Sequence, residues 1–512
     1  MTYVSVVVVA RVLNVQLVAV ITRLNRTSRY NLKHQVAGDG HLTSRQEPTM
    51  ELLFVLFSIA AIVWMIPIFH GGRLLRMATV VLLTGTVVGP SFFAFNGPIQ
   101  FSFDRMLWAA MLALAVIHWR MGNIRTVKMT RVDWMVAGMV GLFLISGTIQ
   151  GAGTHQDQSF SRWIFYVLMP AGVYVITRLV EIRESDIRWV SRLVLGLCTY
   201  LAVTALFEVK GLHALVFPKY ILDPTNWEFL GRGRGPLLNP IGNGFVISVG
   251  VAICCLNFIK GDRRMKVISA FMAMVLMVGV YATLTRSVWI GAMLGIGVIG
   301  FMYSPRWLRV LGLASIVLLV GALSLGLKDQ LTALKRDKDV SAADAAKSIT
   351  LRPLLAIVAW EMFKDKPIAG HGFGRYFENN KPYHDTQAYD VPLKEVKPYL
   401  QHNTFLAILV DTGLLGITLF CGFLFSISSI AWSLARERNG KIEVRFIGLL
   451  ALAVLASYLP NAMFHDMLII PMVHMFMFFV AGVLVTIHQR GFATSPEQSP
   501  VNRRSAVPAM SA

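Results

Sequence analysis

Polar side chains that could bind or react with a substrate stand at the edges of apolar stretches in this chain. His402 and Asn403 directly precede one long apolar run, and Arg286 separates two others. Arg232 and Arg234 alternate with glycines shortly before a further run. A charged side chain at membrane depth costs roughly 2.5–3.5 kcal/mol on insertion scales and is usually retained for a function. These five residues are therefore the first candidates for chemistry.

The arginine and histidine sites suggest phosphate binding combined with proton transfer. A guanidinium matches phosphate oxygens bidentately, and glycine lets backbone N–H groups approach a phosphate closely. A histidine with a pKa of about 6.5 suits proton abstraction from a sugar hydroxyl near neutral pH. The start of a helix favours the neutral imidazole that a base needs. The alternative is that the arginines anchor hairpins at the membrane interface and that His402 is structural.

The composition fixes the class of protein that must position these residues. Hydrophobic residues make up 55% of the 512 residues and charged residues only 15%, against about 25% in soluble domains. Runs of about 20 apolar residues, each able to cross ~30 Å of hydrocarbon, recur along the chain. We predict an all-α polytopic membrane protein with about 12–14 transmembrane helices and a large outer loop that contains amphipathic helices. The predicted spans are 51–69, 76–95, 105–119, 133–149, 162–180, 188–208, 241–259, 266–284, 287–303, 308–326, 403–431, 444–461 and 467–488.

The charge pattern predicts the orientation of these spans. Alternate short loops are rich in Lys and Arg, which places them on the cytoplasmic side. The remaining loops, including the long loops 209–240 and 327–402, then face outward, so the active face is the outer one. The net charge of +20 is explained by orientation, and we predict no nucleic-acid partner. All four cysteines lie inside apolar runs, so we expect no disulfide framework.

The chain divides into five predicted segments. Residues 1–49 form an N-terminal extension that is either an extra, poorly inserted span or targeting segment, or lies upstream of a true start at Met50. Residues 50–326 form the N-terminal transmembrane bundle, 327–402 the outer loop, and 403–490 the C-terminal transmembrane helices. The tail 491–512 is rich in Ser, Pro, Gln and Arg and is predicted to be disordered and cytoplasmic.

The outer loop 327–402 is predicted to carry its own structure. Apolar residues from Arg352 to Phe363 recur at helical spacing and indicate an amphipathic helix on the membrane surface. Tyr399 and other tyrosines of this loop could stack against sugar rings, or could form an interfacial aromatic belt. An Asp-x-Asp at 337–339 lies among alternating charges and favours a solvated surface. We predict neither a metal site nor a cofactor.

Taken together, these motifs resemble those of the O-antigen ligase and polymerase superfamily of bacterial envelope glycosyltransferases. The resemblance covers about residues 220–425. Its parts are His402-Asn403-x-Phe405-Leu406 with Gly413 and Gly416 downstream, Thr285-Arg286-Ser287, Arg234-Gly235-Pro236 with Asn239-Pro240, and Gly370-x-Gly372-x-Gly374.

The resemblance implies a metal-independent transfer of a glycan from an undecaprenyl diphosphate carrier. Arg234 and Arg286 would hold the diphosphate, and His402 would act as base or orienting group for the acceptor hydroxyl. Arg232, Asn403, Arg352 and Tyr399 would bind substrate. The acceptor would be lipid A–core or another glycan, and the active face the periplasmic side of the inner membrane. Family ligases are expected to have both termini in the cytoplasm, whereas the spans counted from Met50 place the N-terminus outside.

Three other functions remain open at this point. Within the superfamily, a polymerase that joins repeat units or a protein O-oligosaccharyltransferase differs only in the acceptor. A lipid or sugar transporter would also place charges inside the membrane. Transport predicts internal repeats with interrupted spans in matching halves, and no such repeat is evident in the sequence.

Overall fold

A computed structural model describes residues 74–92, 94–95, 101–124, 127–149, 159–226, 228–307, 309–310, 342–385, 389–437 and 441–493. Several predictions fall outside the described residues: the extension 1–49 with Met50, the span 51–69, the span 308–326 beyond residue 310, the Asp-x-Asp motif, and the tail after residue 493.

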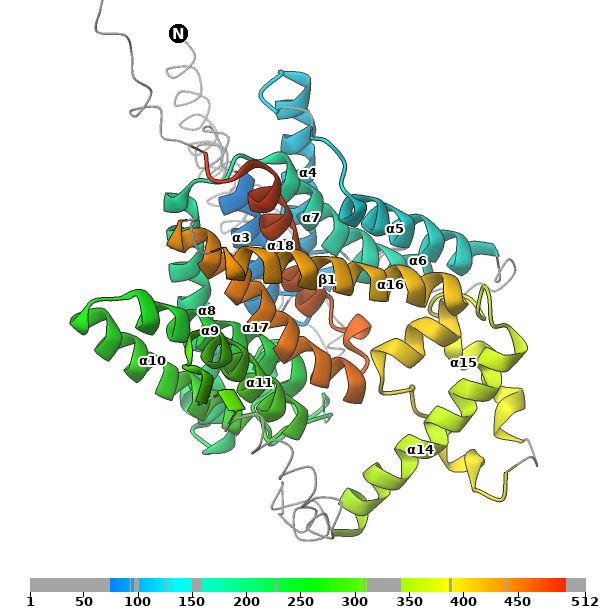
Figure 1. The fold of residues 1–512 in the computed structure, drawn as a ribbon. Coiled ribbons are helices and arrows are strands. Elements are labelled where there is room, and N and C mark those ends of the chain that lie inside the picture. The colour runs from blue at the N-terminus through cyan, green and yellow to red at the C-terminus, as the bar shows by residue number, and fades with distance from the viewer. Residues whose placement is uncertain are drawn as a thin grey trace, which may run out of the picture. The chain divides into compact units, whose positions relative to one another are not determined.

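The described residues form an all-α polytopic membrane fold, as predicted (Figure 1). Eight helical segments within them are long and apolar enough to cross a membrane. The helices are α3 (Leu74–Val87), α4 (Phe103–Arg120), α5 (Arg131–Ile149), α6 (Ser159–Trp163), α7 (Met169–Leu179), α8 (Glu184–Val209), α9 (Pro240–Lys260), α10 (Arg263–Ala282), α11 (Arg286–Tyr303), α14 (Ala342–Asp365), α15 (Tyr376–Asn379), α16 (Thr404–Arg436), α17 (Ile442–Phe464) and α18 (Pro471–Arg490).

Short elements join these helices. The two-residue strands β1 (Ala94–Phe95) and β2 (Phe101–Ser102) pair antiparallel between α3 and α4. A π-helical turn, Ile164–Leu168, connects α6 to α7, so that Ser159–Leu179 forms one span. The 3₁₀ turns are His213–Leu215, Lys219–Leu222, Lys381–His384, Leu393–Val396 and Met467–Ile469.

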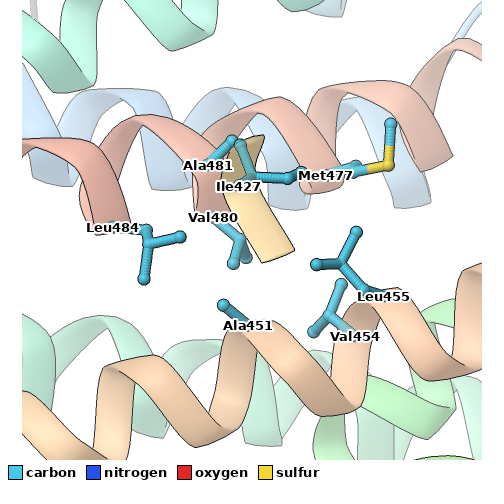
Figure 2. A pocket seen from close by; sticks show the side chains of 8 residues that line it. All are labelled: Ile427, Ala451, Val454, Leu455, Met477, Val480, Ala481 and Leu484. Atoms are coloured by element: carbon cyan, nitrogen blue, oxygen red, sulfur yellow. The ribbon is translucent and has the colours of Figure 1, made fainter. Parts of the chain in front are cut away.

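Small residues bring neighbouring helices close together. A Cβ at Gly291 of α11 would lie 2.6 Å from the Ser457 carbonyl oxygen of α17, and a Cβ at Gly295 would lie 2.8 Å from the Ser457 hydroxyl. Membrane helices associate largely through such close packing, because lipid supplies no hydrophobic force between them. A small cavity of about 10 Å³ lies between α16, α17 and α18 (Figure 2). Its lining is Ile427, Ala451, Val454, Leu455, Met477, Val480, Ala481 and Leu484, all apolar side chains without a partner for water.

α16 is interrupted at Gly413, whose φ of 64° and ψ of −159° are not helical. Backbone of the preceding loop fills the gap: His371 and Gly372 donate N–H groups to the carbonyls of Val410 and Asp411, at 2.8 and 2.9 Å. Leu414 in turn donates to the carbonyl of Pro367, at 2.8 Å. The glycine-rich turn at 370–374 is therefore part of the membrane bundle, and it replaces the bonds that an unbroken helix would make itself.

Polar contacts gather at the two ends of the bundle. At one end α17 finishes beside the start of α16, and α10 finishes beside the loop between α8 and α9. Figure 1 shows α14 and α15 beside the beginning of α16 at this same end. We call it the His402 end. At the opposite end Arg178 forms an ion pair with Asp133 at 2.8 Å, and Lys441 forms one with Glu184 at 2.8 Å.

Candidate functional site

His402 and Asn403 form the entrance to α16. His402 is half-buried and has a φ of +48°, a left-handed conformation that is uncommon outside glycine. Asn403 caps the helix, since its Oδ1 accepts the Leu406 N–H at 3.0 Å. Its Nδ2 donates to the Met463 carbonyl at 2.9 Å, at the end of α17. The cap therefore holds His402 beside the end of a second helix.

Thr404 fastens this entrance to the connection between α17 and α18. Its hydroxyl donates to the His465 carbonyl at 3.0 Å and accepts the Met467 N–H at 2.8 Å. The side chain is fully buried. One hydroxyl thus satisfies two backbone groups of the connection, and it sets the position of that connection relative to His402.

Arg352 lies close enough to His402 for its charge to act on the imidazole. Burial lowers the pKa of His402 below 6.5, and the positive charge of Arg352 lowers this pKa further. The Arg352 guanidinium carbon stands 5.5 Å from the centre of the Phe464 ring, at the end of α17. The imidazole is therefore neutral at neutral pH and can accept a proton.

The register between α11 and α17 places Arg286 at the same end of the bundle as His402. α11 and α17 run antiparallel, with Gly291 against Ser457 and Asn461, and Gly295 against Ala453 and Ser457. Continuing this register by five residues places Arg286 opposite the end of α17 near Phe464. The end of α17 is thus common to Arg286, Arg352 and His402.

Arg234 is placed differently from the prediction. It is 1% exposed, and all five guanidinium N–H groups donate to backbone carbonyls of the loop 221–228. Glu208 of α8 accepts the backbone N–H groups of Arg234 and Gly235, at 3.2 and 2.9 Å. This geometry leaves no donor for a diphosphate and makes Arg234 the residue that shapes the loop. The neighbouring Arg232 is half-buried, 5.6 Å from the ring centre of Phe229.

The Arg234 loop also contacts the connection before Arg286. The Gly233 N–H donates to the Ala282 carbonyl at 2.9 Å, and a Cβ at Gly233 would lie 2.8 Å from that oxygen. Asn243 of α9 donates to the Gly233 carbonyl at 2.9 Å. The Arg234 loop is therefore joined through its backbone to the end of α10, three residues before the Thr285-Arg286-Ser287 motif.

A cavity of about 690 Å³ opens at the His402 end. Its charged lining residues are Asp104 and Arg105 of α4, Arg162 of α6, and Glu228 of the Arg234 loop. Its walls come from the ends of α3 and α18 and from the loop residues Phe229 and Pro236–Asn239. The complete lining is Gly85, Gly89, Pro90, Ser91, Asp104, Arg105, Ser161, Arg162, Phe165, Tyr166, Met169, Glu228, Phe229, Pro236, Leu237, Leu238, Asn239, Ile469, Ile470, Pro471 and Met472. A volume of this size suits one organic headgroup.

Arg162 is held at the wall of this cavity by the glycine-rich turn. Its Nη1 donates to the Gly374 carbonyl at 2.8 Å, and the Gly374 N–H donates to the Asp411 carboxylate at 2.8 Å. The Gly374 peptide therefore links a cavity arginine to a buried carboxylate of α16. Asp466, in the connection between α17 and α18, is also buried, and burial raises its pKa to about 7 against the lowering effect of Arg162.

The sequence patterns did not single out Arg105, Arg162 and Asp466. Arg105 and Arg162 are the first residues of two predicted spans, 105–119 and 162–180, on the predicted outer side. An arginine at that position was the available signal, and it would have grouped them with Arg286. Asp466 carried no comparable signal, because an Asp in a short loop is usually solvated.

The tyrosines of the outer loop divide into two kinds. Tyr383 donates to Asp365 at 2.7 Å and Tyr389 to Glu361, so both help to fold the loop onto α14. Tyr399 is 38% exposed and presents its ring at the surface. Within the described ranges, no three His, Cys, Asp or Glu side chains are grouped as a metal ion would require.

The fold and these sites define a polytopic membrane protein whose loop-bearing end carries a cavity with two arginines and two acidic residues in its wall, and a neutral histidine. Residues 270–421 match the family model described as O-antigen ligase, which supports membership of the chain in the O-antigen ligase superfamily. The matched segment contains Arg286, Arg352, Tyr399, His402 and Asn403. The match supports glycan transfer of the ligase or polymerase type. Among curated proteins, no sequence matches this chain.

Proposed function

We propose that the protein transfers a glycan from an undecaprenyl diphosphate-linked donor to an acceptor hydroxyl, most simply that of lipid A–core, at the periplasmic face of the inner membrane. The observation that carries the proposal is the cavity of about 690 Å³ with Arg105 and Arg162 in its wall. The diphosphate of the donor binds these two arginines. The family match to residues 270–421 supports the reaction class.

The arginines contribute to the transfer through the leaving group. The acceptor oxygen forms a bond to the anomeric carbon of the donor glycan while the bond from that carbon to the diphosphate oxygen breaks. The bonding electron pair leaves with the diphosphate, which gains negative charge. Arg105 and Arg162 stabilise this charge, and the protein surroundings, less polar than water, strengthen the effect.

His402 receives the proton that the acceptor hydroxyl loses. Its lowered pKa keeps the imidazole neutral at neutral pH, which a general base requires. The connection between α17 and α18 reaches from His402 to the cavity. Its first residues, His465 to Met467, are hydrogen-bonded to Thr404 beside His402, and its later residues Ile469 and Ile470 line the cavity. We therefore place the donor in the cavity and the acceptor on the side of His402.

Arg286 and Arg352 complete the acceptor side of the proposed site. Both lie at the end of α17 with His402, so they suit a phosphorylated or acidic acceptor sugar, or the outer phosphate of the donor. Arg232 and Tyr399 stand farther out, as contacts to the glycan chain. Arg234, with Glu208, has a positioning role.

The surface polymers of a deletion strain test the proposed reaction. Loss of a ligase leaves lipid-linked polymer beside bare lipid A–core. Loss of a polymerase leaves single repeat units, and loss of a protein oligosaccharyltransferase leaves lipopolysaccharide intact while a glycoprotein disappears. An unchanged profile of all these glycans, with altered uptake of a lipid or sugar, would overturn the proposal in favour of transport.

A further inference from the structure

The rim of the Arg105–Arg162 cavity is apolar and exposed on one side. Ser91 and Phe229 line the cavity, and each is followed by an exposed apolar residue, Phe92 and Leu230 respectively. Phe92 is 45% exposed and Leu230 is 46% exposed. Both lie in connections between helices, where exposed side chains are more often polar.

Tyr220 joins this rim to the cavity wall. The rings of Phe92 and Tyr220 meet edge to face, with centroids 6.2 Å apart. The Tyr220 hydroxyl donates to the Pro236 carbonyl at 2.7 Å, and Pro236 is itself part of the cavity lining. Phe92 is therefore held beside the opening of the cavity, although neighbouring residues leave nearly half of its surface uncovered.

The segment that leads to Tyr220 has the composition of a membrane interface. Leu212, Leu215 and Phe217 are each about half exposed, and they alternate with exposed basic residues, of which Lys219 donates to the carbonyls of His213 and Ala214. This segment begins directly after Val209, the last residue of the apolar helix α8. Apolar side chains mixed with basic ones are typical of a surface that lies in lipid headgroups.

The cavity is too small to hold a whole polyprenyl diphosphate, so part of such a ligand must extend across this rim. About 690 Å³ accommodates a diphosphate and part of a sugar, in the range of sites that bind drug-sized molecules. A long isoprenoid chain attached to that diphosphate does not fit beside them, so it must leave the cavity toward lipid. The exposed apolar rim, continuous with the cavity lining, is the surface that this chain would bury.

We propose that Phe92 and Leu230 form a lateral portal through which the isoprenoid chain of a polyprenyl diphosphate passes from the cavity into the bilayer. The portal contributes affinity in proportion to the apolar surface that it buries, and it selects for a long prenyl chain over a headgroup alone. This inference rests on the proposed function, because it takes the Arg105–Arg162 cavity as the diphosphate site.

Binding to the purified full-length protein tests the portal with two probes, undecaprenyl diphosphate and inorganic diphosphate. The double variant Phe92→Ser/Leu230→Ser should bind undecaprenyl diphosphate at least about tenfold more weakly, since each buried apolar side chain adds affinity. Binding of inorganic diphosphate should not change. Phe425→Ser is the matched control, since Phe425 of α16 is 76% exposed and away from the cavity lining.

Phe92→Leu keeps an apolar side chain and should retain most of the affinity for undecaprenyl diphosphate. An unchanged affinity in the double variant would overturn the portal, as would equal weakening for both probes. An undecaprenyl diphosphate with a photoreactive group in its chain should label the segments around residues 92 and 230. Labelling confined to other helices would also overturn it. Failure of the proposed function looks different: in that case Arg105→Ala and Arg162→Ala leave the binding of both probes unchanged.

Discussion

At the scale of single residues, the site combines a neutral imidazole with cations that lie close by. Burial and the charge of Arg352 keep His402 unprotonated, while Arg105 and Arg162 line the cavity in which we propose that the diphosphate binds. A proton acceptor beside positive charge loses basicity but remains available near neutral pH. This combination suits a transfer in which negative charge develops on a leaving group and a proton leaves a hydroxyl.

His402→Ala should lower the turnover of glycan transfer by about 10²–10⁴-fold, the usual contribution of a positioned base. In the unaltered protein, the rate should fall as the pH drops below 6.5, because protonation through the lowered pKa of His402 removes the base. The measurement is a pH–rate profile in proteoliposomes. A fall already centred near pH 7 would indicate Asp466 instead, and full activity of His402→Ala would exclude the histidine.

Arg162→Ala should raise the KM for the lipid-linked donor by roughly 10- to 150-fold, as expected for a lost hydrogen bond to a charged group of about 1.5–3 kcal/mol. Arg162→Lys keeps the charge but loses the planar fork, so an intermediate KM is expected. Arg192→Ala, an exposed arginine at the opposite end, is the control. Equal KM values in all three variants would remove Arg162 from the donor site.

Glu208→Ala should lower the thermal stability of the solubilised protein, because it leaves the N–H groups of Arg234 and Gly235 buried without an acceptor. Each such group costs about 1–3 kcal/mol. Glu208→Gln retains one acceptor oxygen and should be destabilised less. Glu395→Ala, at an exposed position, should match the unaltered protein. Identical unfolding temperatures for all of these proteins would show that Glu208 does not support the loop.

At the scale of elements, the break in α16 places the glycine-rich turn inside the bundle. The turn binds α16 before Gly413, Pro367 and Ile368 accept the N–H groups of α16 that follow Gly413, and Gly374 also binds Arg162. An unbroken helix would have no free backbone groups for this contact. The outer loop is therefore attached to the membrane part through main-chain hydrogen bonds, which are specific in direction and position.

Gly413→Ala tests this attachment. Its φ of +64° strains any other residue, and the new Cβ would stand 2.3 Å from the Ile368 carbonyl oxygen. We expect loss of most transfer activity and a lower unfolding temperature. Gly297→Ala in α11 is the matched control, since nothing lies within 4 Å of its Cβ position, and alanine there should stabilise the helix by about 0.5–1 kcal/mol. Equal behaviour of the two variants would contradict the role of the break.

At the scale of the whole molecule, the two polar ends of the bundle differ in structure. The opposite end is fastened by ion pairs such as Arg178–Asp133, whereas the His402 end carries the cavity and the broken helix. The periplasmic orientation of the His402 end remains a prediction from the charge pattern.

Cysteine labelling measures this orientation. A membrane-impermeant maleimide should modify Lys394→Cys in intact spheroplasts, and it should modify Lys266→Cys only after the membrane is opened. The parent protein with its four native cysteines gives the background. The reverse pattern of labelling would invert the topology and place the proposed reaction on the cytoplasmic side.

The sequence alone determined the class of fold and supplied candidate residues for the site. Apolar runs predict spans because each span satisfies its own backbone hydrogen bonds, so the information is local. For the same reason α4, α8–α11, α17 and α18 begin and end within a few residues of the predicted bounds. His402, Asn403 and Arg286 stood out because polar groups are conspicuous against apolar runs. The family match covers all three of them.

Only the tertiary structure decided which of these residues meet. Arg234 was predicted to bind phosphate. Its guanidinium instead donates hydrogen bonds to backbone carbonyls that lie up to 13 residues away in the chain. Arg105 and Arg162 share one cavity although 57 positions separate them, and Gly374 links Arg162 to Asp411 across three segments. Whether a side chain faces a cavity or a carbonyl depends on non-local packing, and a single sequence does not encode that packing in any local pattern.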